Sequence, residues 1–154
     1  CAPHMAGDVY YLRGNTVGVT LWGLVLSGGN AAWLGKKLPI GVLGGILTAN
    51  DIARLDLGNT DMVVLSACKS GQGKATSEGL YGLQRAFKKA GVGTIVMSLW
   101  GVSDKVTSEF MVAFYEQLVN GKVWNKRKAF ENAKMIVRKK HPEPFYWAVF
   151  VMLD

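Results

Sequence analysis

The residue with the clearest chemical potential is Cys68, a thiol that comes soon after a continuous apolar run at residues 62–65. A run without polar alternation predicts a strand buried on both faces, as in a parallel sheet covered by helices. In such sheets, ligands and catalytic groups gather at the carboxyl ends of the strands. Ser70, Gly71 and Gly73 then allow a tight turn that keeps the thiol accessible. Cys68 is therefore the candidate nucleophile, with a buried structural thiol as the alternative.

A cysteine nucleophile needs a base, because the thiolate attacks and a free thiol titrates only at about 8.5. The chain contains two histidines, His4 and His141. Cysteine peptidases with an Ala-Cys motif can place the histidine roughly 50 residues upstream, and Cys68 follows His4 by 64 residues. His141 precedes Pro142 in a basic link, where a helix-capping or solvent-exposed role accounts for it. His4 is therefore the candidate base.

Other site chemistries fit this turn poorly. A phosphate-binding loop would need Gly at position 68 and Ser or Thr at 75, where the sequence has Cys68 and Ala75. The dinucleotide-binding fingerprint fails because Thr76 stands in place of its third glycine. The two cysteines and two histidines also lack the usual spacing of metal ligands. We therefore expect neither a cofactor nor a metal.

Several elements must position the site. A capping box at Thr48 and Asp51 opens a short helix to about residue 55. The strand at 62–65, an amphipathic helix at 77–90 stopped by Gly91 and a strand at 94–100 predict a right-handed parallel crossover. The remaining predictions are strands at 8–13, 17–27 and 145–153, a loop at 31–45, and helices at 103–120 and 124–140.

Length and composition indicate one globular domain. The chain has 154 residues, of which 49% are hydrophobic and 19% charged. The uncharged window at 14–35 predicts a soluble hairpin rather than a membrane span, because it carries six glycines. Two cysteines make no disulfide framework, which favours a reducing cytoplasm. Without an initial Met or a leader, the chain is expected to be a fragment with further sequence upstream.

The net charge of +7 is concentrated between residues 122 and 140. Nucleic-acid binding is one interpretation of these cations. The other is a solvated helix face, because an apolar stripe at helical spacing leaves the cations on the opposite side. The stripe consists of Phe130, Ala133, Ile136 and Val137. We favour the solvated face, and so expect neither nucleic acid nor a membrane as partner.

Five ordered motifs carry a family resemblance. They are Val64–Gly73 (VLSACKSGQG), Glu78–Phe87 (EGLYGLQRAF), Ser98–Asp104 (SLWGVSD), Phe114-Tyr115 and Phe145–Phe150 (FYWAVF). Over nearly the whole chain, the sequence resembles the CHAT domain, a caspase-like cysteine peptidase module of bacteria that is akin to separase. That domain commonly follows tetratricopeptide repeats.

The resemblance implies an α/β fold of caspase-like, three-layer type, in which helices flank a mostly parallel central sheet. It also implies that residues 1–154 form a single CHAT domain, truncated at its N-terminus. The early strands of the sheet would be missing from the chain. On this view the chain is the C-terminal portion of a longer protein with upstream tetratricopeptide repeats.

The same resemblance implies a cysteine endopeptidase acting on protein or peptide substrates. Cys68 matches the nucleophile and His4 the base, while the backbone N–H groups of Cys68 and Met5 would form the oxyanion hole. Asp104 matches an aspartate that helps the pocket accept a basic residue before the cleaved bond, although a carboxylate there also suits a helix N-terminus. Pro3 and Met5 depart from the Ala-Thr-His-Gly pattern of the family. A catalytically degenerate module that works in protein interaction is therefore the alternative.

Overall fold

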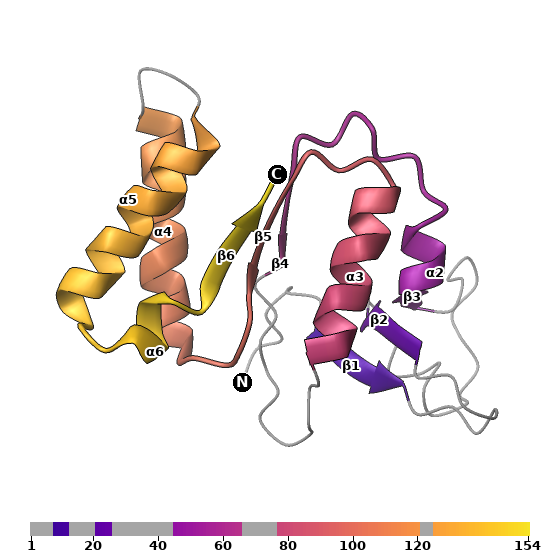
Figure 1. The fold of residues 1–154 in the computed structure, drawn as a ribbon, viewed down its shortest axis with the longest axis horizontal. Helices are drawn as coiled ribbons and strands as arrows, with labels where there is room; N and C mark the ends of the chain where they lie inside the picture. Colours follow the sequence, from indigo (N-terminus) through magenta and orange to yellow (C-terminus); the bar gives the residue numbers. More distant parts are fainter. Residues whose placement is uncertain (1–7, 13–20, 26–44, 66–76, 121–124) are drawn as a thin grey trace.

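The structure, a computed structural model, describes residues 8–12, 21–25, 45–65, 77–120 and 125–154 (Figure 1). Its strands are β1 (Asp8–Leu12), β2 (Leu21–Val25), β3 (Ile46–Thr48), β4 (Met62–Leu65), β5 (Thr94–Ser98) and β6 (Phe150–Leu153). Its helices are α2 (Ala49–Ile52), α3 (Ser77–Lys89), α4 (Asp104–Asn120), α5 (Lys126–Lys140) and α6 (Pro144–Trp147). The predicted turn at Gly14-Asn15 and the predicted loop at 31–44 lie outside the described residues.

The first sheet is a small antiparallel one with the order β1-β2-β3. Its first two strands confirm the strands predicted within 8–13 and 17–27. The third strand, β3, was not predicted, because three residues carry too little pattern. It leads directly into α2, where the predicted capping box is present: Asp51 N donates to Thr48 Oγ1 at 3.2 Å, and Thr48 N donates to Asp51 Oδ2 at 3.0 Å. The helix ends at Ile52, earlier than predicted.

The second sheet has the order β4-β5-β6 and holds the predicted crossover. Strands β4 and β5 are parallel, with Leu65 opposite Met97, and α3 connects them. Strand β6 adds to the other edge of β5 in the antiparallel direction. The prediction of a strand over 145–153 is wrong in its first part, because α6 occupies residues 144–147. Pro144 stands at the first position of that helix, where its fixed φ favours a helical turn.

Helices cover both faces of this second sheet, which makes three layers (Figure 1). All five residues of β5 are buried, and their side chains alternate between the two faces. Val96 packs into the cluster built by α4, α5 and β6, whereas Ile95 and Met97 pack into the cluster built by α2 and α3. Leu24 and Leu47 bring the first sheet against the second cluster. The mixed α/β fold with a helix-flanked sheet agrees with the predicted fold class.

The larger core cluster is aromatic. Phe110 of α4 stacks on Phe150 of β6 with ring centroids 3.9 Å apart, and meets Phe130 of α5 edge-on at 5.4 Å. All three side chains are buried. These contacts explain why α5 turns its apolar stripe inward and its cations outward, as predicted. No helix among the described residues is long and apolar enough to cross a membrane.

Candidate active site

The carboxyl ends of β4 and β5 lie together, because the two strands are parallel and in register at Leu65 and Met97. In the sequence, Cys68 follows the last residue of β4 by three positions. Strand β5 runs on through residues 99–103 into the first turn of α4 (Figure 1). In sheets of this kind, ligands bind beyond the carboxyl ends of the strands. This edge is therefore the candidate active site.

Three of the predicted site residues, Cys68, His4 and Met5, lie outside the residues that the structure describes. Their predicted roles as nucleophile, base and oxyanion donor stay predictions. Asp104 is the predicted site residue that the structure does describe.

Asp104 is the first residue of α4 and its carboxylate is exposed to solvent. The residue before it, Ser103, starts the helix as predicted: its backbone carbonyl accepts from Thr107 N at 3.1 Å, and its hydroxyl accepts from Val106 N at a long 3.4 Å. A carboxylate in the first turn is stabilised by the helix dipole. Because it is also solvent-exposed, Asp104 can meet a cationic group that approaches this edge. The geometry suits both of the roles predicted for it.

Next to Asp104 in the sequence, the segment that leaves β5 is fixed to the α6 region. Leu99 N donates to Val149 O at 2.9 Å, and the indole N–H of Trp100 donates to Phe145 O at 3.0 Å. The rings of Trp100 and Phe145 lie 6.2 Å apart. Leu99, Trp100 and Phe145 nevertheless remain 40%, 36% and 52% exposed. Trp100 therefore both holds this segment in place and contributes to an exposed apolar surface.

A second group of polar side chains lies one to two turns into α4. His141 Nε2 is 3.0 Å from Glu109 Oε2, and Lys140 Nζ is 3.9 Å from the same oxygen. The hydrogen bond from His141 holds the pKa of the Glu109 carboxyl below its ordinary value, and the charge of Lys140 acts in the same direction. His141 also ends α5, its N–H donating to Val137 O at 2.8 Å. The helix-capping role predicted for His141 is confirmed.

A chain of ring contacts joins this pair to Trp100. The ring of His141 lies 5.3 Å from that of Tyr146, Tyr146 lies 5.4 Å from Phe145, and Phe145 contacts Trp100. The α5–α6 link is therefore packed against both α4 and the end of β5. No local sequence pattern signals this connection, because its members are separated by 32 and 45 residues.

Within the part of the chain that the structure describes, no three His, Cys, Asp or Glu side chains are grouped closely enough to hold a metal ion. The chemistry available at this edge is that of a carboxylate, exposed aromatic rings and the residues that follow β4.

The sequence was found to be similar to one protein family and to two named proteins. A family model of the CHAT domain matches residues 17–154. The chain is also similar to two proteins named Tetratricopeptide repeat protein 28, one from Mus musculus and one from Homo sapiens. Each is 34% identical over 110 residues, a segment that covers 70% of this chain and 4% of the relative. The resemblance predicted a module of bacteria, whereas these two relatives are mammalian.

Proposed function

The chain belongs to the CHAT domain family, and from this premise we propose that it is a cysteine endopeptidase domain that cleaves polypeptide substrates. His4 takes the proton of Cys68, and the thiolate attacks the scissile carbonyl carbon. The backbone N–H groups of Cys68 and Met5 stabilise the tetrahedral oxyanion. His4 then gives its proton to the leaving amine, and a water molecule that His4 deprotonates releases the acyl group from the sulfur.

The observation that carries this proposal is the shared carboxyl edge of β4 and β5. Cys68 follows β4 by three positions, and the connection that leaves β5 ends at the exposed carboxylate of Asp104. A nucleophile and an acidic pocket residue are then contributed by neighbouring strands. We expect Asp104 to receive a basic side chain from the residue before the cleaved bond.

We further propose that a repeat region regulates this domain and that it works in the cytoplasm. The support for the repeat region is the name of the two mammalian relatives, which are tetratricopeptide repeat proteins. The segment they share with this chain covers 4% of each relative, so most of each relative lies outside the matched segment. The support for the cytoplasm is the cysteine content, since two cysteines make no disulfide framework.

The first test is the pH dependence of alkylation at Cys68, measured in a Cys1→Ser background. A thiol paired with a protonated imidazole reacts well below pH 8, whereas a free thiol titrates at about 8.5. We expect Cys68 to be alkylated well below pH 8 in the Cys1→Ser background. When His4→Ala is added to that background, this reaction at low pH should be lost. Equal, free-thiol titration in both variants would mean that no dyad is assembled.

The second candidate function is a degenerate module that serves in protein interaction. It is favoured by Pro3 and Met5, which replace the hydroxyl residue and the glycine of the family motif. The variant Cys68→Ala separates the two functions. It abolishes cleavage of a peptide substrate if the domain is an enzyme, and leaves partner binding unchanged if the domain is a scaffold.

A further inference from the structure

Nearly all of the net charge of the chain resides on one helix. Helix α5 carries seven Lys and Arg residues and one carboxylate, a net charge of +6, while the whole chain carries +7. The buried face of the helix is apolar and consists of Ala129, Phe130, Ala133 and Val137. The cations are therefore confined to the rim and the outward face of α5. Such a local excess of one sign attracts anionic partners.

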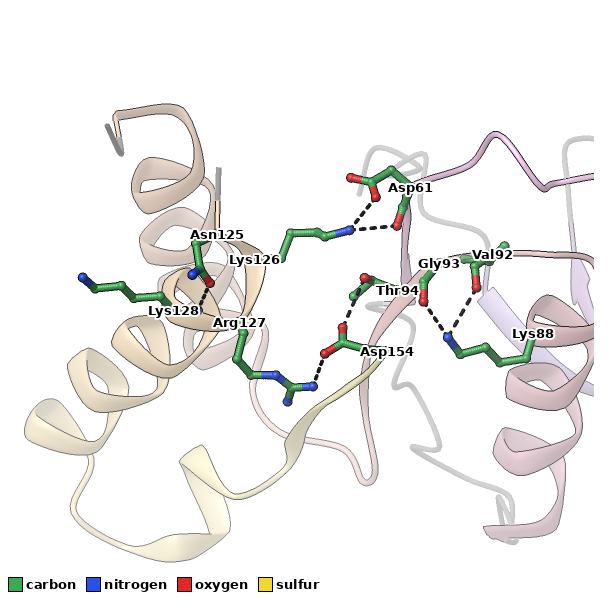
Figure 2. Close-up of polar contacts among 10 residues, drawn as sticks. All are labelled: Asp61, Lys88, Val92, Gly93, Thr94, Asn125, Lys126, Arg127, Lys128 and Asp154. Carbon is green, nitrogen blue, oxygen red and sulfur yellow. Dashed lines mark hydrogen bonds and ion pairs between the residues drawn. The ribbon is translucent and has the colours of Figure 1, made fainter. Parts of the chain in front are cut away.

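Three of these cations have carboxylate partners within the domain. Lys126 Nζ lies 2.5 Å from Asp61 Oδ1, just before β4, and Arg127 pairs with Asp154, just after β6 (Figure 2). Lys140 lies near Glu109, as described above. These pairs fasten both ends of α5 to the rest of the domain. Between those two ends, two further cations of α5 have contacts of a different type.

Between these fastened ends, Lys134 and Arg138 lie against aromatic rings instead of carboxylates. Arg138 Cζ lies 5.0 Å from the centre of the Trp147 ring, and Lys134 Nζ lies 5.8 Å from the same ring and 5.6 Å from that of Phe130. The indole N–H of Trp147 is itself bonded to Pro142 O at 3.2 Å. Among the described residues, neither cation forms an ion pair. The rings hold the two charges in place without neutralising them.

These two cations are one turn apart on the same helix, so they repel each other. A bound group with negative charge would remove that repulsion. Because the rings already restrain both side chains, little side-chain entropy would be lost on binding. Lys134 and Arg138 are therefore preorganised to bind a negatively charged group.

The outward face of α5 also contains an exposed apolar side chain. Met135 is 57% exposed, and helical spacing places it on the same face as Lys128, Glu131 and Arg138. In Figure 2 the Lys128 side chain points away from the sheet. Methionine among cations suits a protein partner, because an unbranched thioether adapts to apolar side chains. The phosphates of a nucleic-acid backbone, in contrast, offer no apolar group that could pack on Met135.

Single-stranded nucleic acid is the less suitable partner. Such strands bind by stacking bases on exposed aromatic rings. Trp147 is the ring that lies against Lys134 and Arg138, but it is half-buried and both cations lie over it. Its face is therefore not open for a base.

We propose that this outward face is a docking surface for an acidic polypeptide segment. We name it the basic face of α5 and define it by Lys128, Lys134, Met135, Arg138 and Lys139, with Glu131 as its one carboxylate. Carboxylates of the partner pair with Lys134 and Arg138, and an apolar residue of the partner packs on Met135. This surface acts independently of Cys68, so it stands whether or not the domain is a peptidase.

The test measures binding of a fluorescein-labelled synthetic peptide of Glu and Leu residues by fluorescence anisotropy. The variant Lys134→Gln/Arg138→Gln is compared with Arg85→Gln/Lys89→Gln, which removes an exposed cation pair of equal spacing from α3. We expect the α5 variant to bind about tenfold more weakly, since buried or restrained charge pairs govern dissociation. The α3 variant should bind within about twofold of the parent, as remote exposed charges contribute little. Circular dichroism shows that both variants are folded.

A second variant, Met135→Glu, places a carboxylate at the centre of the basic face without removing a cation. It should weaken binding of the acidic peptide as much as the double variant does. The proposal is overturned if the peptide fails to bind, or if the α3 and α5 variants weaken binding equally. It is also overturned if an oligothymidylate of equal charge binds more tightly than the peptide, because the surface would then serve nucleic acid.

Discussion

The indole N–H of Trp100 donates a hydrogen bond to the backbone carbonyl of Phe145 at 3.0 Å, and the two rings pack against each other. This contact connects the segment that follows β5 with the first residues of α6. Because that same segment leads to Asp104, the position of this carboxylate depends on a contact between two residues that are 45 positions apart in the sequence.

Replacing Trp100 therefore tests how strongly this connection stabilises the domain. Trp100→Phe keeps a ring but removes the donor, so we expect the free energy of unfolding to fall by about 1 kcal/mol. Trp100→Ala removes both interactions, and we expect a loss of about 2 kcal/mol. Urea unfolding followed by circular dichroism measures both values. Equal values for the two variants would show that the ring packing contributes nothing.

Asp104 can be tested for its two roles separately. If the carboxylate receives a basic substrate residue, Asp104→Asn lowers kcat/KM for an arginine-containing peptide by about tenfold or more, through loss of a charged pair. Its effect on the free energy of unfolding should stay near 0.3–1 kcal/mol, the usual size of a helix-dipole contribution. Glu116→Gln, an exposed acid farther along α4, serves as the control and should change neither. A normal kcat/KM for Asp104→Asn would leave only the capping role.

The contact between Glu109 and His141 makes stability depend on acidity. The pKa of Glu109 is lowered in the folded state, chiefly by the hydrogen bond from His141. A group with a lowered folded pKa stabilises the protein fully above its unfolded value, near 4.5, and this contribution disappears as pH falls through the folded pKa. We therefore expect the free energy of unfolding of Glu109→Gln to fall less steeply below pH 4.5 than that of the parent protein.

Carbon-detected NMR titration of the Glu109 carboxyl tests the cause of that shift. In His141→Ala the pKa of Glu109 should rise toward its ordinary value. Lys105→Ala removes a weaker influence and should move the pKa less. A pKa that stays low in His141→Ala would assign the shift to the lysines.

Among the glycines that the structure describes, Gly91 is the one at which an added side chain should cost most. Its φ is +99°, and a Cβ atom there would lie 2.9 Å from the Cα atom of Gly58. Val92 N donates to Phe87 O, and Gly91 N donates to Lys88 O, the two bonds of a Schellman motif that ends α3. We expect Gly91→Ala to lower the free energy of unfolding by about 2 kcal/mol. In Gly58→Ala the nearest atom is a flexible carboxylate at 3.4 Å, so the change in stability should be small.

Phe110 should be the most sensitive aromatic position of the core. It is fully buried and contacts the rings of Phe114, Phe130 and Phe150. Phe110→Ala should lower the free energy of unfolding by about 3–5 kcal/mol, because it leaves a large cavity. Val112→Ala, two residues along the same helix and exposed, should change it by less than about 0.5 kcal/mol. Chemical denaturation of both variants gives the comparison.

The parallel crossover could be predicted because its signals are local. The apolar runs of β4 and β5, the helical spacing of α3 and the glycine after it specify the crossover without reference to the rest of the chain. The capping box likewise predicted α2, although that helix has four residues. Strand β3 and helix α6 have three and four residues, which is too few for a periodic pattern, and no side chain caps α6, so these two could not be predicted in this way.

In the candidate site, too, features with local signals could be predicted and contacts between distant residues could not. The start of a helix at Ser103 and Asp104 follows from local capping preferences, and the sequence predicts it. The contact between Trp100 and Phe145, and the pair of Glu109 with His141, arise only when distant elements pack together. Periodicity and spacing describe one element at a time, so contacts of this kind require the structure.

Strand β6 has a consequence for the order in which the domain is completed during synthesis. It is the antiparallel partner of β5, yet residues 150–153 leave the ribosome only after the whole of α4 and α5. Until then one edge of β5 is open, although all five of its residues are buried in the finished domain. An apolar strand with an open edge is a site for wrong pairing with other nascent chains. The α4–α5 hairpin, which forms from neighbouring sequence, can cover the face of β5 that carries Val96 during that interval, but the edge itself is closed only by β6.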